Sequence, residues 1–151
     1  MNKKDINFLE DLLYNTDQNY IINQLNQIKD SLLLHVFAAN YNWNSGFNIP
    51  KVILNNKYCD FGTGLLMFYY ADGYLMLENP EEVLASSNEN WIDFLNTVYR
   101  QLINSEFGLH NISFAPPLTK VQRFKLRKNN PNIPETLINR SPGKEITLPT
   151  L

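Results

Sequence analysis

Apolar residues recur every three or four positions through the first third of the chain, a spacing that is typical of amphipathic helices. The first stripe is formed by Ile6, Leu9, Leu12 and Leu13, and the second by Ile21, Leu25, Ile28, Leu32, Val36 and Ala39. The second stripe passes through Asp30 and Ser31, and serine is also a residue that caps a new helix. The pattern therefore predicts either one helix or two between residues 21 and 39.

The middle of the chain predicts a loop and a short helix. The loop covers residues 41–48 and contains Gly46. The helix covers residues 49–54 and has Pro50 in its first turn, where the missing N–H of proline costs nothing. Asn55 and Asn56 are expected to end it.

A further helix is predicted over residues 61–72. Asp60 is expected to cap its free amides and Gly73 to end it in a left-handed conformation. Gly62 and Gly64 lie inside this helix, which each weakens by about 1 kcal/mol relative to alanine. We therefore expect another helix to approach closely at these two positions.

The clearest helix begins near residue 89. Ser86 and Glu89 have the spacing of a capping box. A wide apolar stripe follows, formed by Trp91, Phe94, Leu95, Val98, Tyr99 and Leu102. Just before it, Pro80 followed by two glutamates predicts a short helix, because negative charge is favoured in a first helical turn.

The chain changes character after Asn111. Residues 112–115 predict a short strand, and six of the eight prolines lie from Pro116 onward. The sequence thus predicts a mainly α fold. We expect a compact multi-helix domain of short antiparallel helices, with a proline-rich irregular or short-strand C-terminal segment.

Charge divides the chain at the same place. The net charge is −2, but residues 1–115 carry six basic and 13 acidic residues, whereas residues 116–151 carry seven basic and two acidic. The net charges of the two segments are therefore −7 and +5. We expect a helical body, residues 1–115, with a basic C-terminal extension, residues 116–151, that packs on it within a single domain.

Composition excludes several classes of protein. A chain of 151 residues with 44% apolar residues can bury a core without a disulfide or metal. Its one cysteine, Cys59, excludes an internal disulfide and a multi-cysteine metal site. No leader sequence or membrane span is evident, and no cofactor motif is present, so we expect a cytoplasmic protein without cofactor or metal.

Catalytic candidates are few. Cys59 and His35 could form a nucleophile pair, because a helix N-terminus can lower the pKa of a thiol. His35 lies in an apolar run, however, where a buried, hydrogen-bonded histidine is the commoner outcome. We therefore assign no catalytic residue, and a small enzyme that uses Cys59 stays an alternative.

One basic run is a candidate for nucleic-acid binding. Residues 120–128 carry five positive charges, and as a strand they would place Arg123, Lys125 and Arg127 on one face. The acidic pI of about 5.6 argues against this partner. The same run leaves open an adaptor whose basic tail docks on a protein or a nucleic acid.

An ordered series of motifs covers about residues 31–75. It contains Asn-Tyr-Asn-Trp at residues 40–43, Gly-Phe at 46–47, Cys-Asp-Phe-Gly-Thr at 59–63 and Ala-Asp-Gly at 71–73. This series resembles a family of small bacterial proteins of unknown function, in which the turn usually reads Trp-Asp-Asp-Gly. Asn44 and Ser45 replace both acids here, which weakens an acid-based catalytic or metal role for the turn.

The resemblance implies a mainly helical fold and a candidate binding site. The site residues would be Trp43, Asn44, Gly46, Phe47, Asp60, Tyr69 and Asp72. They either line an exposed concave surface or belong to the scaffold. In size and setting the family resembles immunity proteins of bacterial toxin systems, so we expect a protein that binds and neutralises a cognate toxin. The sequence leaves its oligomeric state open.

Overall fold

A computed structural model describes all 151 residues as a stack of short helices. The elements are α1 (Lys3–Tyr14), α2 (Gln18–Gln27), α3 (Ser31–Asn40), the 3-10 turn η1 (Trp43–Ser45), α4 (Asn48–Asn55), α5 (Phe61–Tyr70), α6 (Gly73–Glu78), α7 (Pro80–Leu84), α8 (Glu89–Ile103), β1 (Ile112–Ser113), α9 (Lys120–Asn129), the 3-10 turn η2 (Glu135–Leu137) and β2 (Lys144–Glu145). The predicted mainly α fold is confirmed.

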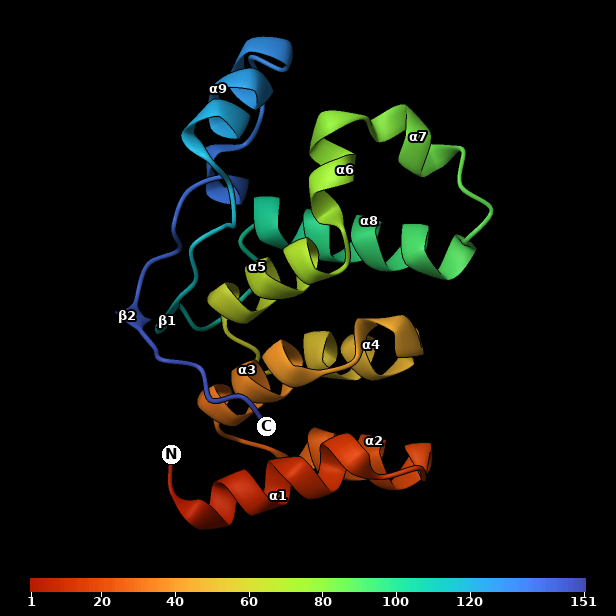
Figure 1. Cartoon of the computed structure of the whole chain (residues 1–151), viewed down its shortest axis with the longest axis vertical. Coiled ribbons are helices and arrows are strands. Elements are labelled where there is room, and N and C mark those ends of the chain that lie inside the picture. The colour runs from red at the N-terminus through yellow and green to blue at the C-terminus, as the bar shows by residue number, and fades with distance from the viewer.

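The helices lie in layers (Figure 1). α1 and α2 form the lowest layer, α3 and α4 the next, and α5 with α8 the third, while α6 and α7 lie above them. Contacts between neighbouring layers run from α1 to α3, α2 to α4 and α3 to α5, and α5 packs against α8 within the third layer. One continuous core of 31 buried residues extends through the stack. None of the helices combines the length and the apolar character needed to cross a membrane.

The second apolar stripe is divided between two helices. α2 ends at Gln27, and the side chain of Asp30 accepts a hydrogen bond from the amide of Leu32 at the start of α3. Asp30, rather than Ser31, is therefore the cap. The Asn56 side chain then ties α4 to this break, because it donates to the carbonyl oxygens of Leu25 and Ile28 at 2.9 and 3.0 Å.

The N-terminus of α5 is tied to the segment that leads into β1. Asp60 caps α5 as predicted, and its buried carboxylate also accepts hydrogen bonds from the amides of Asn111 and Ile112. A Cβ at Gly62 would lie 2.0 Å from the carbonyl oxygen of Ile112. The close approach predicted at Gly62 is real, but its partner is this segment and not another helix.

The left-handed residue after α5 is Asp72, with φ +61°, and the prediction of Gly73 in that role is wrong. Gly73 begins α6 instead. A Cβ there would lie 2.4 Å from the carbonyl oxygen of Phe68. Glycine is thus needed at position 73 because there is no space for a side chain, whereas the left-handed conformation is adopted one position earlier, by Asp72.

The prediction of a strand over residues 120–128 is also wrong, because these residues form α9. Thr119 and Gln122 make a capping box, in which each side chain accepts a hydrogen bond from the backbone amide of the other residue. At α8, by contrast, Asn88 is the cap and the expected Ser86 box does not form. A strand needs backbone partners, whereas a capped helix satisfies its own backbone groups.

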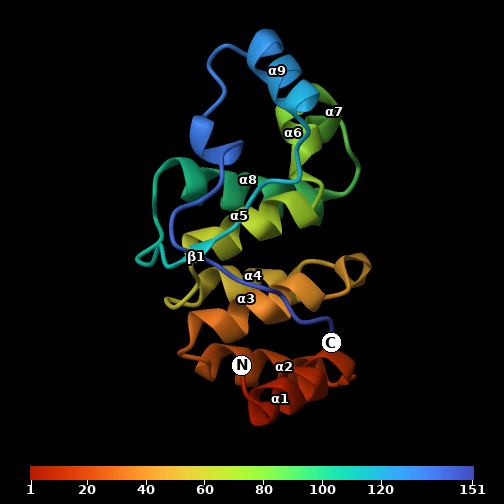
Figure 2. The same ribbon diagram turned by 60° about the vertical axis from the view of Figure 1, so that its left-hand side comes forward.

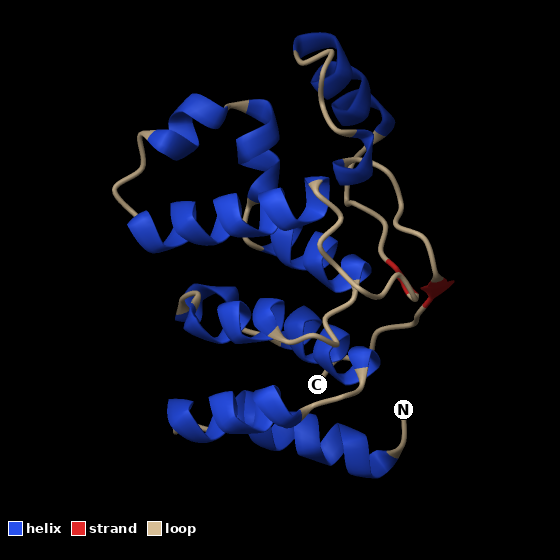
Figure 3. Ribbon diagram, turned by 180° about the vertical axis from the view of Figure 1, so that it is seen from behind, coloured by secondary structure: helices blue, strands red, loops and turns tan.

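The segment after α9 runs back along one side of the stack to α3 (Figures 1 and 2). β2 pairs in parallel with β1 on this path, and the two short strands stand out against the helices in Figure 3. The Asn40 side chain of α3 donates to the carbonyl oxygen of Pro149 at 3.0 Å and accepts from the amide of Leu151 at 2.9 Å. These hydrogen bonds hold the last residues against the helical body.

Candidate functional site

Five of the seven predicted site residues line one surface cavity of about 600 Å³. They are Trp43, Asn44, Gly46, Phe47 and Asp72. The remaining lining comes from Tyr70, Ala71, Ser86, Asn88 and Trp91. We call this the turn cavity, because the η1 turn forms one of its walls. Its volume lies within the range of ligand sites in proteins.

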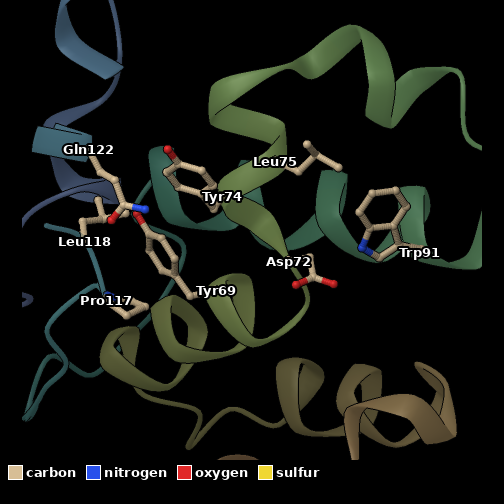
Figure 4. A pocket seen from close by; sticks show the side chains of 8 residues that line it. All are labelled: Tyr69, Asp72, Tyr74, Leu75, Trp91, Pro117, Leu118 and Gln122. Carbon is tan, nitrogen blue, oxygen red and sulfur yellow. The ribbon is translucent and has the colours of Figure 1, made fainter. Parts of the chain in front are cut away.

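A second cavity of about 340 Å³ adjoins the first (Figure 4). It is lined by Tyr69, Asp72, Tyr74, Leu75, Trp91, Pro117, Leu118 and Gln122, and we call it the tyrosine cavity. Figure 4 shows the Asp72 carboxylate between the indole of Trp91 and the rings of Tyr69 and Tyr74. Asp72 and Trp91 line both cavities.

Hydrogen bonds within the turn of residues 41–47 fix the first wall. The Asn42 side chain accepts from the amide of Asn44 at 3.1 Å, and the Tyr41 hydroxyl donates to the carbonyl oxygen of Gly46 at 2.9 Å. The Trp43 indole N–H donates to the carbonyl oxygen of Ala38 at 3.1 Å. The half-buried ring of Trp43 is thereby anchored at one edge. It packs against Phe94 and also lines the turn cavity.

The second wall is fixed in the same way. The Trp91 indole N–H donates to the carbonyl oxygen of Ala71 at 2.7 Å, which ties the first turn of α8 to the end of α5. Asp72 follows directly, and its side chain forms no capping hydrogen bond. It is exposed at the boundary between the two cavities. The backbone around Asp72 is thus well fixed, whereas its carboxylate is free to bind a ligand.

Asp72 is the only charged residue among those that line the two cavities. Burial raises the pKa of Tyr69, with the charge of Arg123 opposing the shift, and burial also raises the pKa of Tyr74. Both phenols therefore stay protonated at pH 7. The two cavities together form an aromatic site with one negative charge.

The other two predicted site residues lie differently. Tyr69 lines the tyrosine cavity, and its hydroxyl donates to the carbonyl oxygen of Leu137. Asp60 lies in neither cavity and is fully buried. Its carboxylate is occupied by the amides that it holds, so the structure gives Asp60 a role in joining α5 to the segment before β1.

Cys59 and His35 are buried, each with 2% of its surface exposed. Burial raises the pKa of the Cys59 thiol, and the neighbouring Asp60 raises it further. The expected activation by the helix N-terminus is therefore outweighed. His35 Nδ1 lies 2.9 Å from Thr63 Oγ1, and burial lowers the pKa of this imidazole to about 4. The structure leaves the enzyme alternative without an accessible nucleophile at Cys59.

The three residues proposed for nucleic acid do not share a face, because α9 is a helix. Arg127 pairs with Glu135 at 2.9 Å, while the Nε of Arg123 is buried. Lys125 is exposed. The outer face of α9 instead presents Lys120, Val121, Phe124, Lys125 and Lys128, all of them exposed.

The fold and the site define a mainly helical domain with an aromatic, singly acidic surface site. Residues 29–103, which are 75 of the 151 residues, match the family described as "Domain of unknown function (DUF4274)", and this match confirms the resemblance to a family of unknown function. The matched segment contains all seven predicted site residues and also Trp91. No curated protein and no solved structure matched the chain.

The sequence did not identify Trp91 as a site residue. Its position in the apolar stripe of α8 indicates a core residue, and it lies 19 residues beyond Asp72. Only the return of the chain through α6 and α7 brings the start of α8 back to the end of α5. A weak signal was present, because Trp43 and Trp91 are the only two tryptophans of the chain.

Proposed function

We propose that this chain is a small bacterial binding protein of the immunity type, which acts in the cytoplasm and neutralises a cognate toxin by binding it directly. The observation that carries the proposal is the convergence of Trp43, Phe47, Asp72 and Trp91 on one exposed cavity. Tryptophan and tyrosine are enriched among the residues that dominate protein–protein binding energy. An aromatic surface held in place by backbone hydrogen bonds suits such an interface.

The charge distribution supports a basic partner. Residues 1–115 carry a net charge of −7, and Asp72 places one of the negative charges inside the aromatic site. Complementary charge accelerates association and discriminates against wrong partners. A toxin that binds nucleic acid, such as a nuclease, has a surface of the required sign.

Co-expression tests the proposal. The product of the neighbouring gene is expressed alone and together with this chain, and we expect rescue of growth and co-purification. Asp72→Asn is expected to weaken the complex. Asp17→Asn removes the same charge from the exposed cap of α2, where asparagine caps equally well, and serves as the control. If the neighbouring product is harmless alone and does not co-purify, the proposal is wrong.

The outer face of α9 favours a second candidate function, that of an adaptor. Val121 and Phe124 are 61% and 65% exposed, between three lysines. An exposed apolar pair with flanking positive charge fits an acidic protein partner. Replacing Val121 and Phe124 with serine separates the two functions, because it abolishes binding through α9 and leaves binding through the turn cavity unchanged.

A further inference from the structure

We propose that the turn cavity receives an arginine side chain of the partner, with its guanidinium paired to Asp72 and stacked on the surrounding aromatic rings. This inference rests on the proposed function, because it names the group that the site recognises. It is carried by the hydrogen bonds, the ring arrangement and the charge of the cavity.

The hydrogen bonds favour a cation over an anion. Both indole N–H groups that could bind an anion are used by the fold, since Trp43 donates to Ala38 and Trp91 donates to Ala71. The carboxylate of Asp72 is exposed and has no hydrogen-bond partner. The strongest free polar group in the cavity is therefore an acceptor with a negative charge.

The walls are aromatic and mutually braced. The rings of Trp43 and Tyr70 lie 6.4 Å apart at 80°, and Phe94 packs behind Trp43 and Phe47 at 5.9 and 5.3 Å. Phe94 is fully buried, so it anchors this wall to the core. Aromatic faces attract cations, and the attraction is larger where water is partly excluded.

The combination of rings and one carboxylate favours arginine over lysine. A guanidinium is planar, stacks on aromatic rings and is more weakly hydrated than an ammonium group. It also binds a carboxylate through two parallel hydrogen bonds. A lysine ammonium would lose more hydration in this cavity and would gain no stacking.

The two tryptophans provide a specific measurement. Since Trp43 and Trp91 are the only tryptophans and both line the turn cavity, their two indole N–H signals in a ¹⁵N–¹H correlation spectrum report on this site. The probe is N-acetyl-arginine methylamide, titrated at constant ionic strength. The controls are its citrulline counterpart, which has nearly the same shape without the charge, and its lysine counterpart.

We expect saturable shifts of both indole signals with the arginine probe and at least about tenfold weaker binding of the citrulline probe, because a charge-assisted pair is lost. Asp72→Asn is expected to weaken arginine binding to a similar extent, while Asp17→Asn leaves it unchanged. Melting curves of both variants establish that they are folded.

Three results would each overturn the proposal: no response to the arginine probe, equal binding of the citrulline probe, or tighter binding of the lysine probe. An unchanged affinity in folded Asp72→Asn would do the same. These failures differ from failure of the proposed function. If the toxin complex forms and depends on Asp72 while the arginine probe does not bind, only the arginine assignment is wrong.

Discussion

Acidification should destabilise the fold through His35. This imidazole is 2% exposed and lies 2.9 Å from the Thr63 hydroxyl. Burial lowers its pKa from 6.5 to about 4, and the nearby charge of Asp60 opposes the shift only in part. The unfolded chain exposes the same imidazole to water and keeps the ordinary pKa.

The sign and size of the effect follow from these two pKa values. Between pH 6.5 and about 4 the unfolded chain binds a proton at His35 that the folded chain does not bind, so the free energy of unfolding falls as the pH falls. The contribution of the neutral, buried His35 to the free energy of unfolding is fully present above pH 6.5 and is lost by about pH 4. A shift of this size corresponds to about 3 kcal/mol, a large part of the roughly 5–15 kcal/mol that stabilises a typical domain.

Urea denaturation between pH 7 and pH 4 measures this loss. His35→Gln removes the titrating group. Between pH 7 and pH 4 the free energy of unfolding of this variant should fall by about 3 kcal/mol less than that of the natural chain, although the variant is less stable at pH 7. His110→Gln, at the other and exposed histidine, is the control and should keep the dependence of the natural chain. Equal slopes for the natural chain and His35→Gln would refute the assignment, because the loss would then come from carboxylates.

Three further predictions concern the fold and the candidate site. Gly62→Ala should cost at least about 2 kcal/mol in urea denaturation, because its Cβ meets the Ile112 carbonyl, whereas Gly108→Ala, which has no atom within 4 Å, should stay close to the natural chain. Asp72→Gly should raise stability by about 0.5–1 kcal/mol in the same assay, because glycine adopts a left-handed φ without strain. Cys59 should resist iodoacetamide at pH 8 until urea is added; rapid alkylation of the folded protein would contradict its burial.

The helices of the first 103 residues were largely predictable because their signals are local. Spacing of three and four residues identifies each buried stripe, and a side chain beside the first turn marks where a helix begins. Asp60 illustrates this, since its role as a cap follows from its position alone. Its second role is to hold the amides of Asn111 and Ile112. These two residues lie 51 and 52 positions further along the chain, so the local sequence around Asp60 does not indicate this role.

The C-terminal third was harder to predict for two physical reasons. Alternation of basic and apolar residues over 120–128 fits a strand as well as an exposed helix, and only the Thr119 and Gln122 pair marks the helix. The path of the last residues depends on long-range contacts. Asn40 binds Pro149 and Leu151 across 109 and 111 positions, and no local pattern encodes such a pairing.

The candidate site was predictable only as far as the family motifs reach. The motifs contain one wall of the turn cavity and Asp72, because these residues lie close together in the chain. The other wall comes from Ser86, Asn88 and Trp91, outside those motifs. A cavity between elements depends on the path of the chain, so its complete lining could not be read from any one segment.

The motif residues need not belong either to a binding surface or to the scaffold, because one residue can serve both through different atoms. Trp43 and Trp91 give their N–H groups to the fold and their ring surfaces to the cavity. Substituting either tryptophan would therefore affect stability and the proposed binding together. Asp72 differs, since its carboxylate makes no hydrogen bond in the fold and its left-handed backbone suits glycine better. The fold makes no hydrogen bond with this charge, so Asp72 is the position where the proposed binding can be tested while the scaffold remains intact.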